Sequence, residues 1–197
     1  MGVPIEELQR LGIKLFGADG AAVAAREVVP IFHRWIQTSA VADQMLIDVA
    51  DYSHVPDGPG IVLVAHEGNF SLDFAHGGVA LTYFRKQPLP GTFDDRLRAV
   101  ARTAVAACRL LEDDPAIGNR LRFRGDQLVV LCNDRLIAPN SPEARLALQA
   151  PVERWLQAVY GTAECRIGIE ADPRERLQLR AAAAQPLTLR QLGERLG

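Results

Sequence analysis

The spacing of apolar residues changes from helical to alternating near residue 45. Upstream, apolar residues recur every three or four positions over residues 4–16 and 19–37, which predicts two helices, the second kinked or split at Pro30. From Met45 onward the period is two, as in strands that expose alternate side chains to one face. Three further runs follow at 61–66, 70–75 and 79–86, separated by Gly-containing turns. This half of the chain therefore predicts an antiparallel meander of about four strands.

A second group of elements follows the Pro- and Gly-containing stretch at 87–91. Thr92 and Asp95 have the spacing of a capping box, and the apolar stripe behind them predicts a helix as far as Leu111. Gly125 and Asp126 lie between two short apolar runs, which favours a hairpin over residues 121–132.

The C-terminal part of the chain has its own start and stop signals. Asn140 or Ser141 is expected to cap a helix that ends at Gly161. Two apolar runs at 165–170 and 176–182 could pair as strands, although the second also suits a helix. Thr188 is expected to cap a last short helix.

Together these elements predict an α+β fold: an antiparallel β-meander of about four strands plus a second hairpin region, with helices packed on one side. We expect one domain over residues 1–197. An alternative is two lobes, 1–87 and 92–197, on either side of the Pro- and Gly-containing stretch.

Composition excludes several classes of protein. The chain has 197 residues, a net charge of −2 and no apolar run near the roughly 18 residues of a membrane span. We expect a cytoplasmic protein without a membrane partner. Cys108, Cys132 and Cys165 have no metal-binding spacing, so we expect reduced thiols that pack in the core. Acidic residues outnumber basic ones, which makes nucleic acid an unfavoured partner.

The most suggestive polar residues lie in the meander. With a turn at Gly68 and Asn69, His66 would lie opposite Ser71 and diagonal to Asp73 on the polar face of the sheet. The first strand would add Asp48 and Tyr52 to that face, with His54 just beyond it. Two histidines and two carboxylates could hold a divalent metal or act as a His-Asp general base. The competing interpretation is the solvated face of an ordinary antiparallel sheet.

A second polar group follows a predicted strand. Asp134 and Arg135 precede a predicted helix start, a position where loops often carry binding groups. The neighbouring Asn140 and Ser141 are already explained by capping.

No nucleotide-binding, hydrolase-elbow or zinc-protease motif is present in the sequence. We therefore expect a non-catalytic protein that binds a partner protein or a small molecule, with a homodimer through a sheet edge or an apolar helix face as one form. The alternative is a small metal-assisted or His-dependent hydrolase that uses His54, His66 and Asp73. A third alternative is weak nucleic-acid binding through C-terminal arginines (174, 176, 180, 190 and 195). The sequence identifies no cofactor.

Overall fold

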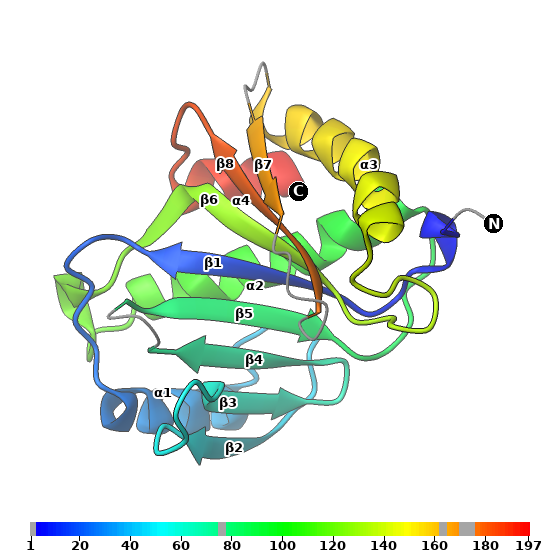
Figure 1. Cartoon of the computed structure of the whole chain (residues 1–197). Coiled ribbons are helices and arrows are strands. Elements are labelled where there is room, and N and C mark those ends of the chain that lie inside the picture. The colour runs from blue at the N-terminus through cyan, green and yellow to red at the C-terminus, as the bar shows by residue number, and fades with distance from the viewer. Residues whose placement is uncertain (1–2, 75–77, 162–164, 170–175) are drawn as a thin grey trace.

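One eight-stranded antiparallel sheet forms the centre of this computed structural model (Figure 1). The structure describes residues 3–74, 78–161, 165–169 and 176–197. The strands are β1 (Leu11–Gly17), β2 (Leu46–Tyr52), β3 (Gly60–Ala65), β4 (Gly68–Asp73), β5 (Ala80–Arg85), β6 (Phe123–Cys132), β7 (Cys165–Ile169) and β8 (Leu177–Ala183). Their order across the sheet is β2-β3-β4-β5-β1-β6-β8-β7. β2 is therefore an edge strand, whereas β1 lies in the interior although it comes first in the chain.

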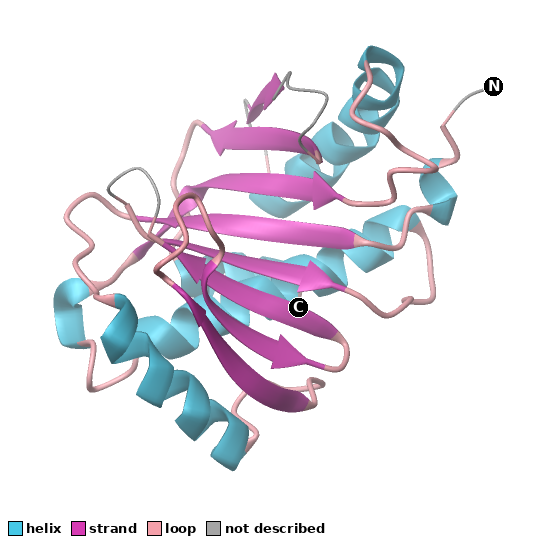
Figure 2. Ribbon diagram, turned by 60° about the horizontal axis from the view of Figure 1, so that its bottom comes forward, coloured by secondary structure: helices cyan, strands magenta, loops and turns pink. Residues whose placement is uncertain are grey.

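Four helices pack against this sheet, and Figures 1 and 2 show them from two directions. α1 (Ala25–Thr38) covers β2 and β3, and α2 (Phe93–Glu112) covers β1 and β5. α3 (Pro142–Tyr160) packs on β7 and β8, and α4 (Leu189–Leu196) lies against α2 and β6. Two short 3-10 turns, η1 (Ile5–Glu7) and η3 (Gly118–Arg120), complete the described elements. Among these helices, none is long and apolar enough to cross a membrane.

Alternation along the strands places one apolar set against the helices. Leu15, Leu81 and Leu128 are at most 2% exposed and lie side by side on β1, β5 and β6. Burial of such side chains contributes about 1.5–3 kcal/mol each. The expected α+β fold with an antiparallel sheet is confirmed. Cys108 and Cys132 are buried in the same core, and burial raises the pKa of the Cys132 thiol to about 11. The side chain of Cys165 lies outside the described part of the structure.

The predicted N-terminal helix over residues 4–16 is wrong. Only Ile5–Glu7 forms a helical turn, and Leu11–Gly17 is the strand β1. Leu11 and Leu15 fit a helical stripe, but with Ile13 they also alternate, and all three are fully buried. This segment forms a strand and not a helix because it pairs with β5 on one side and with β6 on the other. The next helix begins at Ala25 rather than Asp19 and runs through Pro30 without ending.

The predicted hairpin at Gly125 and Asp126 is also wrong, because both residues lie inside the continuous strand β6. Gly125 has a different role. A Cβ at this position would lie 1.8 Å from the Leu187 carbonyl oxygen, so the glycine lets the chain after β8 cross closely over β6.

Helix capping was predictable from the sequence. Thr92 accepts the Asp95 N–H, and the Asp95 carboxylate accepts the Thr92 N–H, as expected of a capping box. Ser141 and Thr188 cap α3 and α4, and α3 stops at Gly161. The strands β7 and β8 pair as expected.

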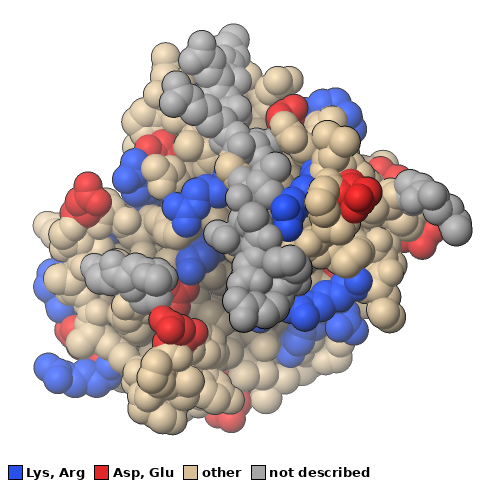
Figure 3. Space-filling model, in the orientation of Figure 1, with Lys and Arg blue, Asp and Glu red and all other residues tan. Residues whose placement is uncertain are grey.

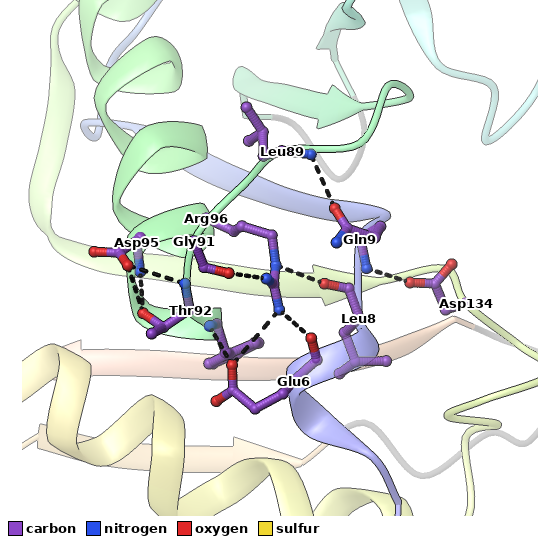
Figure 4. Close-up of polar contacts among 10 residues, drawn as sticks. Glu6, Leu8, Gln9, Leu89, Gly91, Thr92, Asp95, Arg96 and Asp134 are labelled. Atoms are coloured by element: carbon purple, nitrogen blue, oxygen red, sulfur yellow. Dashed lines mark hydrogen bonds and ion pairs between the residues drawn. The ribbon is translucent and has the colours of Figure 1, made fainter.

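A buried arginine ties the N-terminal segment to the start of α2 (Figure 4). Arg96 is 3% exposed, and its guanidinium donates to the backbone carbonyls of Glu6, Leu8 and Gly91. The Glu6 carboxylate lies 3.9 Å from Arg96 and accepts the Phe93 N–H. The charge is thus surrounded by acceptors, which is what a buried cation requires.

Candidate functional site

His66 and Asp73 lie at opposite ends of β4. His66 is in the link between β3 and β4 and is exposed, whereas Asp73 is the last residue of β4. Five steps along a strand separate Gly68 from Asp73, a distance of about 17 Å. His54 is exposed in the turn after β2, at the other end of β3 from His66. The structure therefore does not bring the three residues together.

The expected register between β3 and β4 is wrong, and this accounts for the separation. Ser71 pairs with Val62 rather than His66, because the linking residues are His66 and Glu67. Gly68 serves a close approach instead of a turn. A Cβ there would lie 2.6 Å from the Phe84 carbonyl oxygen and 2.7 Å from the Tyr83 ring. The division into two faces still holds, since Val62, Ser71 and Thr82 lie in line.

Asp73 has a basic partner on the uncovered face of the sheet. Its carboxylate lies 2.8 Å from the Lys14 Nζ, and its side chain is only 14% exposed. Arg180 stacks over Phe16, and Arg176 over Phe84, on the same face. Figure 3 looks onto this face and shows Lys and Arg side chains near its middle. Asp73 is thus held in an ion pair with Lys14, and His66 lies at the other end of β4.

Asp134 has a structural role. Its carboxylate accepts the backbone N–H of Gln9 at 2.7 Å, as Figure 4 shows, and that of Arg10 at 3.0 Å, which fixes the chain before β1. Arg135 is exposed next to it. Of the C-terminal arginines, Arg195 donates to the Val159 carbonyl, and Arg174 lies outside the described residues.

Asp48, Tyr52 and His54 belong to the free edge of the sheet. Among the strands that the structure describes, β2 pairs only with β3, and its other side has no neighbouring strand. Asp48 and Tyr52 share a face with Ser71 through the intervening β3 residue Val62. On an edge strand, however, both side chains are exposed. We define the β2 edge as residues 43–57: the strand with its flanking turns.

Large apolar side chains are unusually exposed on the β2 edge. Met45 and Ile47, which alternation alone would turn toward the core together with Val49, are 65% and 55% exposed. A bulge between Leu46 and Asp48 changes the alternation, so that Leu46 and Val49 pack on the core instead. Of the six large apolar side chains exposed in the described residues, four are in the β2 edge: Met45, Ile47, Tyr52 and Val55.

The β2 edge is also acidic. It contains Asp43, Asp48, Asp51 and Asp57, and none of the ion pairs among the described residues involves them. Residues 35–84 contain no Lys or Arg and six acidic residues, whereas the other 147 residues carry 22 basic and 18 acidic ones. Sequence reasoning missed this asymmetry, which is visible as a long stretch without Lys or Arg.

Hydrogen bonding at the edge is local. The Val49 N–H donates to the side chain of its neighbour Asp48 at 2.8 Å, which places this N–H on the side away from β3. The Ser53 N–H donates to Asp51 at 2.8 Å. These bonds from Ser53, from its hydroxyl first and then its backbone, lower the pKa of Asp51. The outward backbone groups are thus accessible or covered only by short side chains.

The comparisons identify no relative: no family model, no curated protein and no solved structure matches this chain. Within the described residues, no three His, Cys, Asp or Glu side chains form a group that could hold a metal ion. The candidate site therefore rests on the geometry and chemistry of the β2 edge.

Proposed function

We propose that this protein binds an extended, basic and apolar segment of a partner protein, which adds to the sheet along the β2 edge. The observation that carries the proposal is the coincidence of three features at the β2 edge: a free backbone edge, exposed apolar side chains and acidic groups that form no ion pair with the described residues. Addition of a strand to a sheet edge is a recurring mode of peptide recognition.

The exposed edge is unusual because edge strands normally carry devices against uncontrolled pairing. The bulge at Ile47 and the bond from Val49 N–H to Asp48 are such devices here. They leave Ile47 outside the core, where it can contact an incoming side chain. Binding requires the Asp48 carboxylate to turn away from Val49 and accept a charge from the partner instead.

The charge of the β2 edge selects the partner. Four carboxylates along one short segment favour Lys and Arg and repel an acidic segment, and complementary charge also speeds encounter. The apolar side chains between them favour a segment that alternates basic and apolar residues, because alternate residues of a strand face the same side.

The test uses a fluorescent ten-residue peptide of alternating Lys and Val, with a Glu and Val peptide as its counterpart. Anisotropy should show binding of the lysine peptide that weakens with added salt, and much weaker binding of the glutamate peptide. Ile47→Lys should weaken binding about tenfold or more, because it puts a positive charge next to the lysines of the peptide and removes an apolar contact.

The matched control is Leu146→Lys, which makes the same change at a residue that is 73% exposed on α3. The free energy of unfolding of each variant should lie within about 0.5 kcal/mol of that of the natural protein, as is usual for surface substitutions. Equal binding by the two variants, or no binding of the lysine peptide by the natural chain, would refute the proposal. A dimer in sedimentation that Ile47→Lys dissociates would assign the edge to a second copy and refute a separate partner.

A further inference from the structure

A cavity of about 220 Å³ lies on the helix-covered side of the sheet, away from the outward side of β2. It is formed by the α1–β2 connection, the end of β5 and one side of α2. Tyr83 at its base is 1% exposed, whereas Arg102 and Ala106 on α2 are exposed. The cavity therefore runs from the surface at α2 down to the core.

The base of the cavity holds a buried polar pair. The Tyr83 hydroxyl donates to the Gln44 Oε1 at 3.0 Å, and Gln44 is 8% exposed. Burial raises the pKa of Tyr83, against the opposing effect of the nearby Arg85. Tyr83 thus keeps its proton and Gln44 is held in place, which makes this end of the cavity rigid.

The mouth of the cavity is basic. Arg85 donates through Nε to the Gln87 carbonyl at 2.9 Å, and its guanidinium also lies within hydrogen-bonding reach of the Tyr83 hydroxyl. Arg102 makes no hydrogen bond or ion pair with the described residues. Asp43 is the one carboxylate among the described residues that line the cavity. The mouth therefore carries two guanidinium groups, with Asp43 in the lining and the Glu67 carboxylate close to Arg85.

Most of the remaining wall is apolar: Val41, Leu89, Ala99 and Val100 line the cavity together with Ala106, and the hydroxyl of Thr103 in the same lining donates to the Ala99 carbonyl. Drug-sized ligands occupy pockets of about 300–1,000 Å³, so this cavity suits a smaller molecule. An apolar body would pack on these walls while an acidic head meets the arginines, which bind carboxylates through paired N–H donors.

We infer that this cavity binds a small organic carboxylate, with its apolar part toward Val100 and its carboxylate between Arg85 and Arg102. Asp43 and Gln44 belong to both the cavity and the β2 edge, but the inference does not depend on peptide binding at that edge. Asp43 and Gln44, which line the cavity, directly precede the β2 strand region, so the two sites adjoin in the chain.

The test uses benzoate and isovalerate as probes, with benzamide as a neutral molecule of the same shape as benzoate. Thermal unfolding and ¹⁵N chemical shifts should show binding of at least one carboxylate, at Gln44 and along α2. Benzamide should bind about tenfold more weakly or not at all, because it cannot form charge-assisted hydrogen bonds.

Arg102→Gln should weaken carboxylate binding about tenfold, and Arg154→Gln is the matched control on an exposed position of α3. Failure of both carboxylates to bind, equal binding of benzoate and benzamide, or equal loss in the two variants would overturn the inference. The lysine peptide is measured on the same variants, and unchanged peptide binding by Arg102→Gln separates this result from that for the edge.

Discussion

The junction around Arg96 and the β2 edge are both polar, but they differ in how far their polar groups are satisfied. At the junction, a 3%-exposed guanidinium donates to three backbone carbonyls, and the neighbouring Glu6 and Asp134 accept backbone N–H groups (Figure 4). At the β2 edge, Asp43 and Asp57 have no ion pair among the described residues. The polar groups of the junction stabilise the fold, whereas carboxylates of the β2 edge are available to a partner.

This difference separates structural polar residues from candidate binding residues better than residue type does. Asp134 looked like a binding residue in the sequence, yet its carboxylate is occupied by Gln9 and Arg10. Asp48 belongs to the same residue type, but it covers only the N–H of its own neighbour, Val49. Saturation of hydrogen bonds within the fold thus indicates a structural role.

The largest expected effect is at the junction. Arg96→Met leaves the carbonyls of Glu6, Leu8 and Gly91 without their donor, and an unpaired buried polar group costs about 1–3 kcal/mol. We expect a loss of about 3 kcal/mol or more in urea unfolding, with lysine-peptide binding unchanged in the folded protein. Arg154→Met, at an exposed position, should change stability by less than about 0.5 kcal/mol. A small effect of Arg96→Met would show that the junction is not held by this arginine.

The corresponding change at the edge should affect binding instead. The double variant Asp48→Asn, Asp51→Asn removes two negative charges while keeping side-chain shape. Binding of the lysine peptide should weaken about tenfold and become less dependent on salt, because fewer charges are in contact. Titrations at low and high salt measure this. An unchanged salt dependence would mean that the carboxylates of the edge do not contact the peptide.

A smaller effect is expected at the first turn of α2. Thr92→Ala removes the hydroxyl that accepts the Asp95 N–H and should destabilise the protein by about 1 kcal/mol. Thr92→Ser retains an acceptor and should restore most of the loss in urea unfolding. Equal destabilisation by both substitutions would show that the cap contributes through packing of the methyl group.

The smallest effect is the response to acid. Hydrogen bonds from Ser53 lower the pKa of Asp51 below its usual 3.8, and bonds from Thr92 do the same for Asp95. A carboxylate with a lowered pKa contributes stability above its unfolded value, and this is lost as the pH falls through the folded value. The carboxylates of Asp51 and Asp95 should therefore stabilise the folded protein between about pH 7 and about pH 5, and this stabilisation should be lost below pH 3.8. Urea unfolding of Asp51→Asn and Asp95→Asn from about pH 5 down to below 3.8 should show a reduced acid slope, and an unchanged slope would contradict the assignment.

Local signals in the sequence were sufficient for much of the fold. Thr92, Ser141 and Thr188 each cap the helix that follows them, as expected, because capping depends on residues within one turn. Elements decided by distant contacts were not predictable in this way. Leu11 and Leu15 fit both a helical and a strand period, and only their pairing with β5 and β6 makes them part of a strand. Gly125 fits a turn, but its actual role depends on the close approach of Leu187.

The candidate site could be predicted only in part. Asp48 and Tyr52 were selected from their alternation, and both lie on the uncovered face of the sheet. Their position on an edge strand follows from the order of all eight strands, which no local pattern specifies. The bulge that exposes Ile47 is likewise set by pairing with β3.

The interior position of β1 has a consequence for how the protein is made. Ile13 pairs with Tyr83 on one side and with Val130 on the other, so β1 leaves the ribosome long before its second partner strand, β6, has been synthesised. Contacts between residues so far apart in sequence slow folding, and until they form, the apolar side chains of this strand are open to wrong associations. We therefore expect the nascent N-terminal segment to depend on protection by chaperones until β5 and β6 are available.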